Sequence, residues 1–204
     1  MKQYRGCSRL VYAIESEGID GAITYGEVKE LAPVKSVSRD ITSDNEAVYA
    51  DNVVQQRTYG ATSVTRTFET TRISPEVVAE LLGETTMTIG ENKAYLTSPD
   101  GSTRPYIAIG YALHDGDVDN PCEVVWAYHC KVNSISKTSS TIDDGTGSEG
   151  QSVEIVNVAP KKPFAKTGKR NLDFCMPIEN ADPALVEKFF TKVITPDNAE
   201  TELA

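Results

Sequence analysis

Apolar and polar side chains alternate most regularly in residues 104–132, RPYIAIGYALHDGDVDNPCEVVWAYHCKV. Successive side chains of a strand point to opposite faces, so this pattern predicts two strands. One face of the first strand holds Ile107, Ile109, Tyr111 and Leu113. One face of the second holds Val124, Trp126, Tyr128, Cys130 and Val132. Residues 114–121 between them are rich in turn-forming Asp, Gly, Asn and Pro. We expect a hairpin at the centre of a sheet, with Trp126 anchoring a core.

Weaker alternation extends over much of the chain. Further strands are predicted at residues 8–15, 23–40, 59–71, 85–97, 153–159 and 172–176. Pro33 interrupts the second of these and suits an edge or a bend. Residues 42–46 are predicted to form a polar connection, followed by a short apolar piece at 47–51. Residues 136–152 contain almost no apolar side chain and are predicted to form a loop.

Two segments have helical spacing and helix-capping residues. In SPEVVAELLG, Ser74 is a natural N-cap, Pro75 suits the first helical position, and Gly83 ends the element. In DPALVEKFF, Asp182 is the predicted cap of a second short helix. The sum predicts a mainly β fold: an antiparallel β-sandwich or open barrel with one flanking α-helix and a second short helix near the C-terminus.

Length and charge narrow the possibilities. The 204 residues suffice for a β domain, predicted at residues 1–160, and a C-terminal extension, 161–204, packed on the same domain or on a neighbouring subunit. A net charge of −10 disfavours a protein that binds nucleic acid through phosphates. The start MKQYRGCSRL has no signal-peptide pattern, no segment is expected to cross a membrane, and the four cysteines form no CxxC motif. Synthesis in a reducing cytosol is expected.

Catalytic or metal-binding patterns are weak. Asp115, Asp117 and Asp119 resemble the start of a calcium loop, but Trp126 stands where the bidentate Glu is required, so an acidic turn is expected. Cys122, His129 and Cys130 lack a fourth zinc ligand. His114 beside Asp115 resembles an acid–base pair, but no nucleophile motif accompanies it. We expect no enzyme, no cofactor and no metal.

The order of several short pieces resembles the major tail proteins, or tail tube proteins, of long-tailed non-contractile phages and prophages. The matching pieces are YADN at 49–52, LLG at 81–83, PYIAIG at 105–110 and WAYHCK at 126–131. The resemblance extends over residues 7–158 and does not include the chain from Lys161 onward.

The resemblance implies a structural virion protein with a fold like that of type VI secretion tube proteins. Such subunits form hexameric rings that stack into a tube around a tape-measure protein, and genome DNA later passes through the lumen. Tail tip and tail terminator proteins are then further partners. Localisation in the virion tail, after assembly in the host bacterial cytoplasm, is expected. Two alternatives stay open: a tube protein of a contractile injection or secretion system, and a surface- or carbohydrate-binding β-sandwich.

Two sets of residues are candidates for contacts in such a tube. Residues 41–59 are too long for a tight turn and more apolar than a free loop, which predicts a contact between subunits. The candidates are Ala47, Val48, Tyr49, Ala50, Asp51, Asn52, Val53 and Val54. The alternative is an edge strand of the subunit's own sheet. A net-negative lumen is also expected, with Asp115, Asp117 and Asp119 as candidates. For the acidic stretch 143–149, a position outside the lumen is an equal alternative.

Overall fold

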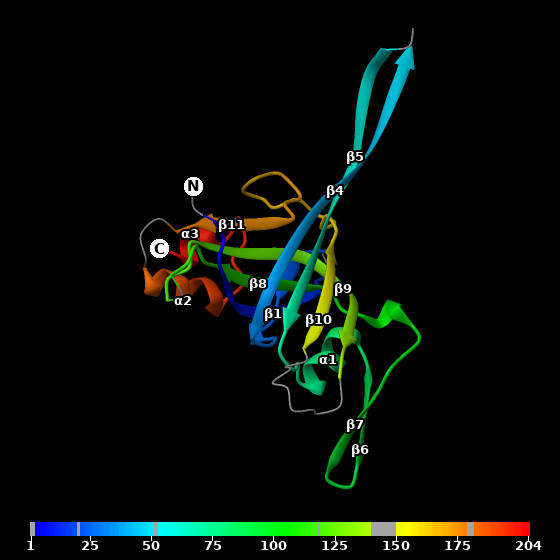
Figure 1. Cartoon of the computed structure of the whole chain (residues 1–204), viewed down its shortest axis with the longest axis vertical. Helices are drawn as coiled ribbons and strands as arrows, with labels where there is room; N and C mark the ends of the chain where they lie inside the picture. Colours follow the sequence, from blue (N-terminus) through cyan, green and yellow to red (C-terminus); the bar gives the residue numbers. More distant parts are fainter. Residues whose placement is uncertain (1–2, 20, 51–52, 118, 140–149, 179–181) are drawn as a thin grey trace, which may run out of the picture.

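The chain forms a curved antiparallel sheet, and two β-hairpins project from the body of the protein (Figure 1). One of them is part of this sheet, and the other is a separate two-stranded sheet. The computed structural model describes residues 3–19, 21–50, 53–117, 119–139, 150–178 and 182–204. Its strands are β1 (Cys7–Glu17), β2 (Ile23–Tyr25), β3 (Lys29–Glu30), β4 (Val34–Ala50), β5 (Val53–Thr70), β6 (Thr85–Ile89), β7 (Asn92–Leu96), β8 (Ile107–Leu113), β9 (Glu123–Lys137), β10 (Gln151–Asn157) and β11 (Asp173–Pro177). Its helices are α1 (Pro75–Leu82), α2 (Pro183–Thr191), α3 (Ala199–Glu202) and the 3-10 turn η1 (Gly101–Thr103). The predicted mainly β, antiparallel fold class is confirmed.

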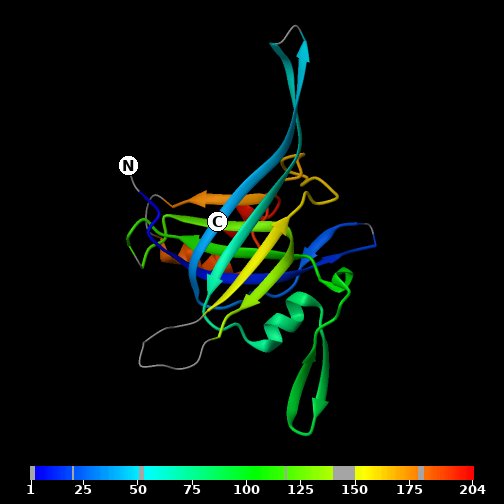
Figure 2. The ribbon, with the colours of Figure 1, turned by 45° about the vertical axis from the view of Figure 1, so that its right-hand side comes forward.

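The main sheet has the strand order β2-β1-β8-β9-β10-β5-β4, with β3 paired to β1 and β11 paired to β9. The predicted hairpin β8–β9 is confirmed at the centre of this order. The sheet bends so that β4, β5 and β10 cross over β1 and β8 (Figures 1 and 2). Strand β9 belongs to both layers, because one half pairs with β8 and β11 and the other half pairs with β10.

Burial on both faces of β8 explains its nearly continuous apolar sequence, IAIGYAL. The first core lies between the two layers and includes Leu10, Phe68, Ile109 and Val153, with α1 packed at its margin. The second core lies between the other face of β1, β8 and β9 and the C-terminal helix α2. Trp126 is buried there, as predicted, and donates its indole N–H to the carbonyl of Phe189 at 2.9 Å.

One predicted strand face is wrong beyond Tyr128. Trp126 and Tyr128 belong to the second core, whereas Cys130 and Val132 belong to the first core. The cause is a β-bulge: Ile107 pairs with Cys130, but Ile109 pairs with Ala127, so β9 contains one extra residue there. His129 has a left-handed backbone (φ 48°) at this bulge. A bulge exchanges the faces of the residues that follow it.

Both predicted helices are confirmed, with their caps. Ser74 accepts a hydrogen bond from the N–H of Val77, and Gly83 ends α1 in the left-handed conformation. Asp182 accepts the N–H groups of Ala184 and Leu185 at the start of α2. Although β11 joins the main sheet and α2 covers it, the division into residues 1–160 and 161–204 stays a prediction.

The expected connection at residues 42–46 is wrong, because those residues are part of β4. Thr42 and Ser43 pair with Ser63 and Thr62 of β5, so β4 and β5 form one long hairpin. Threonine suits a strand with a solvated face, and hydroxyl groups opposite each other add hydrogen bonds such as Thr42–Ser63 at 3.0 Å. Both ends of the expected loop at 136–152 belong to strands, since β9 extends to Lys137 and β10 begins at Gln151. Residues 140–149 lie outside the described residues.

Candidate functional site

The distal part of the β4–β5 hairpin, which we call the arm (residues 41–50 and 53–63), extends well beyond the body of the protein (Figures 1 and 2). Large apolar side chains on it are exposed to solvent: Tyr49 and Tyr59 are each 66% exposed and Val53 is 60% exposed. Ile41 and Val48 are also exposed. Several exposed apolar side chains on one projecting hairpin are typical of a contact surface.

The register of the arm assigns these side chains to two faces. Asn45 pairs with Tyr59 and Ala47 pairs with Arg57, so both tyrosines and Arg57 lie on one face. Val48 pairs with Gln56 and Ala50 pairs with Val53, so the two valines lie on the opposite face. Because β5 contains one extra residue between Val54 and Gln56, the register shift there turns Val53 to the same face as Val48. One face therefore carries both tyrosines and Arg57, and the other carries Val48 and Val53 together with the polar Gln56.

Of the predicted contact residues, Ala47, Val48, Tyr49 and Val53 lie together on the arm. Ala50 and Val54 belong to its paired strands. Asp51 and Asn52, two further candidates, lie outside the described residues. Strand β4 is also an edge strand of the subunit's own sheet, which is the alternative that the sequence left open for residues 47–52. The role of these residues in assembly stays a prediction.

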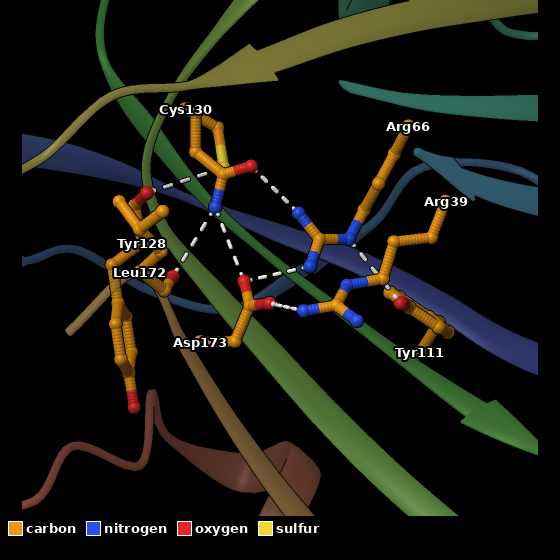
Figure 3. A network of polar contacts seen from close by, with 8 residues as sticks. Arg39, Arg66, Tyr111, Tyr128, Cys130, Leu172 and Asp173 are labelled. Carbon is orange, nitrogen blue, oxygen red and sulfur yellow. Dashed lines mark hydrogen bonds and ion pairs between the residues drawn. The ribbon is translucent and has the colours of Figure 1, made fainter. Parts of the chain in front are cut away.

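A buried polar network holds the base of the arm (Figure 3). Arg39 and Arg66 are cross-strand partners, and both side chains reach Asp173 of β11. Arg66 Nη2 lies 2.6 Å from Asp173 Oδ1, and Arg39 Nη2 lies 2.5 Å from Asp173 Oδ2. One carboxylate therefore bridges two arginines that would otherwise repel each other.

Further hydrogen bonds surround Arg66 in this network. Its Nη1 donates to Asn157 Oδ1 at 2.6 Å, and its Nε donates to the Tyr111 hydroxyl at 3.2 Å. Burial tends to lower the pKa of Arg66, but Tyr111 and Asp173 outweigh it, so the pKa is raised and the charge is retained. The network joins β4, β5, β8, β10 and β11, and it fixes the arm to the body. Sequence reasoning missed it because its members are distant in the chain.

The acidic loop between β8 and β9 is built mainly from its own hydrogen bonds. Asp117 Oδ1 accepts the N–H of Asp119 at 3.0 Å, and Asp117 Oδ2 accepts the Asn120 side chain at 2.9 Å. These hydrogen bonds lower the pKa of Asp117, the one from Asn120 most strongly. Asp119 is exposed and Asp115 is half-buried. The position of Asp115, Asp117 and Asp119 in a lumen stays a prediction. The acidic stretch 143–149 lies outside the described residues.

A second acidic surface was missed by sequence reasoning. Along β9, β10, β5 and β4 the side chains that point away from the first core are mostly hydroxyls and carboxylates. They are Lys131, Ser134 and Ser136; Ser152, Glu154 and Val156; Ser63, Thr65, Thr67 and Glu69; and Ser36, Ser38, Asp40 and Thr42. We call this surface the hydroxyl face. The alternation of threonine with Val64, Arg66 and Phe68 in β5 was its signal in the sequence.

The two histidines have hydrogen-bonding partners within the fold. The ring of His114 lies 2.7 Å from Ser8 Oγ and 2.7 Å from the carbonyl oxygen of Asp117. His129 Nδ1 lies 2.7 Å from Glu15 Oε1, and its ring stacks on Tyr106. Within the described residues, no group of three or more His, Cys, Asp or Glu side chains is arranged to hold a metal ion. Nor does that part of the chain include a helix long and apolar enough to cross a membrane.

No protein-family model and no curated protein matches the chain. Nine chains of solved structures match it, and two of them are the following. The first is described as the anti-feeding prophage cap, the AFP tube terminating cap, with 11% identity, coverage of 84% of this chain and 89% of that chain, and a TM-score of 0.46. The second is an extracellular contractile injection system, the PVC sheath-tube complex in the extended state, with 12% identity, coverage of 84% and 90%, and a TM-score of 0.45.

Proposed function

We propose that this protein is a structural subunit of a phage-tail-like tube, and that the arm makes contacts between subunits. The observation that carries the proposal is the β4–β5 hairpin, which leaves the body with exposed tyrosines and valines. An isolated two-stranded hairpin is only marginally stable in water. Burying its apolar side chains against a neighbour gains roughly 25 cal/mol per Å².

Assembly into a tube is supported by the resemblance of the sequence to tail tube proteins. In the described structure, the sheet ends in β2 on one side and β4 on the other, and an open edge can pair with another copy. Such head-to-tail pairing closes into a ring when the rotation per subunit allows it. We propose homo-hexameric rings that stack around a tape-measure protein, with tail tip and terminator proteins at the ends. The contact physics is the same in a non-contractile tail and in a contractile injection system.

We further propose that the hydroxyl face lines the lumen through which DNA passes. It carries the carboxylates Asp40, Glu69 and Glu154 against the single ammonium group of Lys131 among its described residues. Negative charge repels the phosphates of DNA, and hydroxyl groups keep the surface hydrated. This face extends over four strands, whereas the acidic loop is a single connection between β8 and β9, and the hydroxyl face belongs to the layer from which the arm extends.

The arm is tested by Tyr49→Ala. We expect the variant to keep the fold, because Tyr49 is exposed and lies far from both cores. If the ring is an interface anchor, its loss costs about 2 kcal/mol or more per contact. Since the contact is repeated around every ring, electron microscopy of the purified variant should show no tubes, while circular dichroism matches the wild type.

Two control variants separate the contact from general effects. Tyr49→Phe keeps the ring and should form tubes. Tyr4→Ala removes a tyrosine that is equally exposed but lies outside the arm, and it should also form tubes. Normal tubes from Tyr49→Ala would exclude the proposed role of the arm. Unfolding of Tyr49→Ala would instead assign the tyrosine to the stability of the subunit.

A further inference from the structure

The second projecting hairpin, β6–β7, which we call the ribbon (residues 85–96), has one polar and one apolar face. Its register pairs Thr86 with Tyr95 and Thr88 with Lys93, so these four side chains share a face. Together with acidic residues of α1 they line a cleft, and Lys93 Nζ lies 2.9 Å from Glu76 Oε1. The polar face of the ribbon is therefore turned toward the body of the protein.

The apolar face of the ribbon points to solvent. Thr85 pairs with Leu96 and Met87 pairs with Ala94, and Ile89 continues the same face. Met87, Ile89 and Leu96 are 47%, 58% and 47% exposed. A hairpin that packs on its own protein normally turns its apolar face inward. The reversed orientation here leaves an apolar strip without a cover among the described residues.

The chain itself supplies a segment of matching chemistry. The ribbon and the arm lie at opposite ends of the longest axis of the molecule (Figures 1 and 2). The arm presents Tyr49 and Tyr59 with Arg57 between them, and the ribbon presents its apolar strip next to Glu91 in its turn. Aromatic groups can cover the aliphatic strip while Arg57 meets Glu91.

We propose that the arm of one copy docks on the apolar face of the ribbon of a second copy. The inference rests on the proposed function of the arm and names the surface that receives it. A contact between opposite ends of two identical subunits is heterologous and leaves one free arm and one free ribbon, so it continues from copy to copy. A contact between two arms would instead close after one pair, and would bring the Arg57 side chains of both copies together.

Two variants that each remove one partner test this arrangement. The arm variant is Tyr49→Ser with Tyr59→Ser, and the ribbon variant is Met87→Ser with Ile89→Ser. All four side chains are exposed, so circular dichroism and thermal melting should show that both variants fold. Each variant alone should fail to polymerise. When the two are mixed, the intact arm of one meets the intact ribbon of the other, and growth stops after that contact.

Multi-angle light scattering distinguishes the outcomes. The expected result is a mixed species with twice the mass of either variant alone, and no longer polymer. If the ribbon variant forms normal tubes, the docking proposal is overturned while the proposed function of the arm stands. If the arm variant forms normal tubes, the proposed role of the arm in assembly fails, and the docking proposal fails with it, while the protein is still a tube subunit. If both variants are blocked but the mixture shows no doubled mass, the arm does not bind the ribbon directly.

A charge exchange adds an independent check in the full chain. Arg57→Glu and Glu91→Arg should each reduce the rate of tube growth at low salt, because each brings like charges together at the contact. The double variant Arg57→Glu with Glu91→Arg should recover growth. If both single variants slow tube growth but the double variant does not restore it, the proposed pairing of Arg57 with Glu91 is overturned.

Discussion

The charge of Asp173 stabilises the junction between the arm and the body, and its removal should be costly. The Arg66 side chain is fully buried (0% exposed) and Asp173 is 8% exposed, so water screens this pair weakly. Asp173→Asn keeps the shape of the side chain but leaves the guanidinium of Arg66 without a counter-charge. Breaking a buried pair in this way costs about 3–5 kcal/mol. Folded domains have only about 5–15 kcal/mol of stability, so the loss should be obvious.

The matched control is Arg39→Gln, which removes the other arginine of the same network. The Arg39 side chain is 39% exposed, so its pair with Asp173 is screened by solvent. Exposed pairs contribute about 0–1 kcal/mol. Arg39 is also the cross-strand partner of Arg66, and its loss relieves repulsion between like charges. Asp173→Asn should therefore lower the free energy of unfolding by several kcal/mol more than Arg39→Gln does, although both variants remove contacts of Asp173.

Urea unfolding followed by tryptophan fluorescence measures this difference. Trp126 is the single tryptophan of the chain and is fully buried, so its emission reports loss of the second core. All variants are compared in the Tyr49→Ala background, which we expect not to polymerise, because assembly would add to the apparent stability. Equal unfolding free energies for Asp173→Asn and Arg39→Gln would refute the claim that Asp173 neutralises a buried charge.

Two further predictions concern a helix end and the hydroxyl face. Gly83 and Gly90 both have φ 64°, but an added Cβ at Gly83 would lie 2.4 Å from the carbonyl oxygen of Thr103, whereas Gly90 has open space. Thermal melting should show that Gly83→Ala loses about 2–4 kcal/mol and Gly90→Ala about 1–2 kcal/mol, and equal losses would contradict the steric argument. Tubes assembled from Asp40→Lys with Glu69→Lys should retain DNA in a filter-binding assay at low salt and release it at high salt. No retention by these tubes would place the hydroxyl face away from the DNA path.

The elements that sequence reasoning predicted well are those whose signal is local. The alternation in β8 and β9 and the caps Ser74 and Asp182 each depend on residues a few positions apart. The order of short motifs, through its resemblance to tail tube proteins, led to the hypothesis of a tube subunit. Residues 47–54 were selected because they are more apolar than a free loop.

Other features depend on contacts that a local pattern does not contain. The left-handed backbone of His129 exchanges the faces of β9, and histidine at that position carries no signal for it. The bridge from Asp173 to Arg39 and Arg66 joins residues more than a hundred positions apart in sequence. The polar residues 42–46 resemble a loop by composition, and only their pairing with β5 makes them a strand.

The two projecting hairpins differ from the rest of the chain in where their apolar side chains lie. In the body, apolar faces of strands are buried against two cores. Among its described buried side-chain nitrogen and oxygen atoms, Glu15 Oε2 and Arg66 Nη2 make no hydrogen bond, although Arg66 Nη2 lies 2.6 Å from Asp173 Oδ1. In the arm and the ribbon, the strands are also paired, but apolar side chains such as Tyr49, Val53, Met87 and Ile89 are turned to solvent. Such conflicts between local pattern and fold concentrate at functional sites. They disappear when the arm of one copy covers the ribbon of the next, so the features that are unfavourable in one subunit become the driving force for adding another.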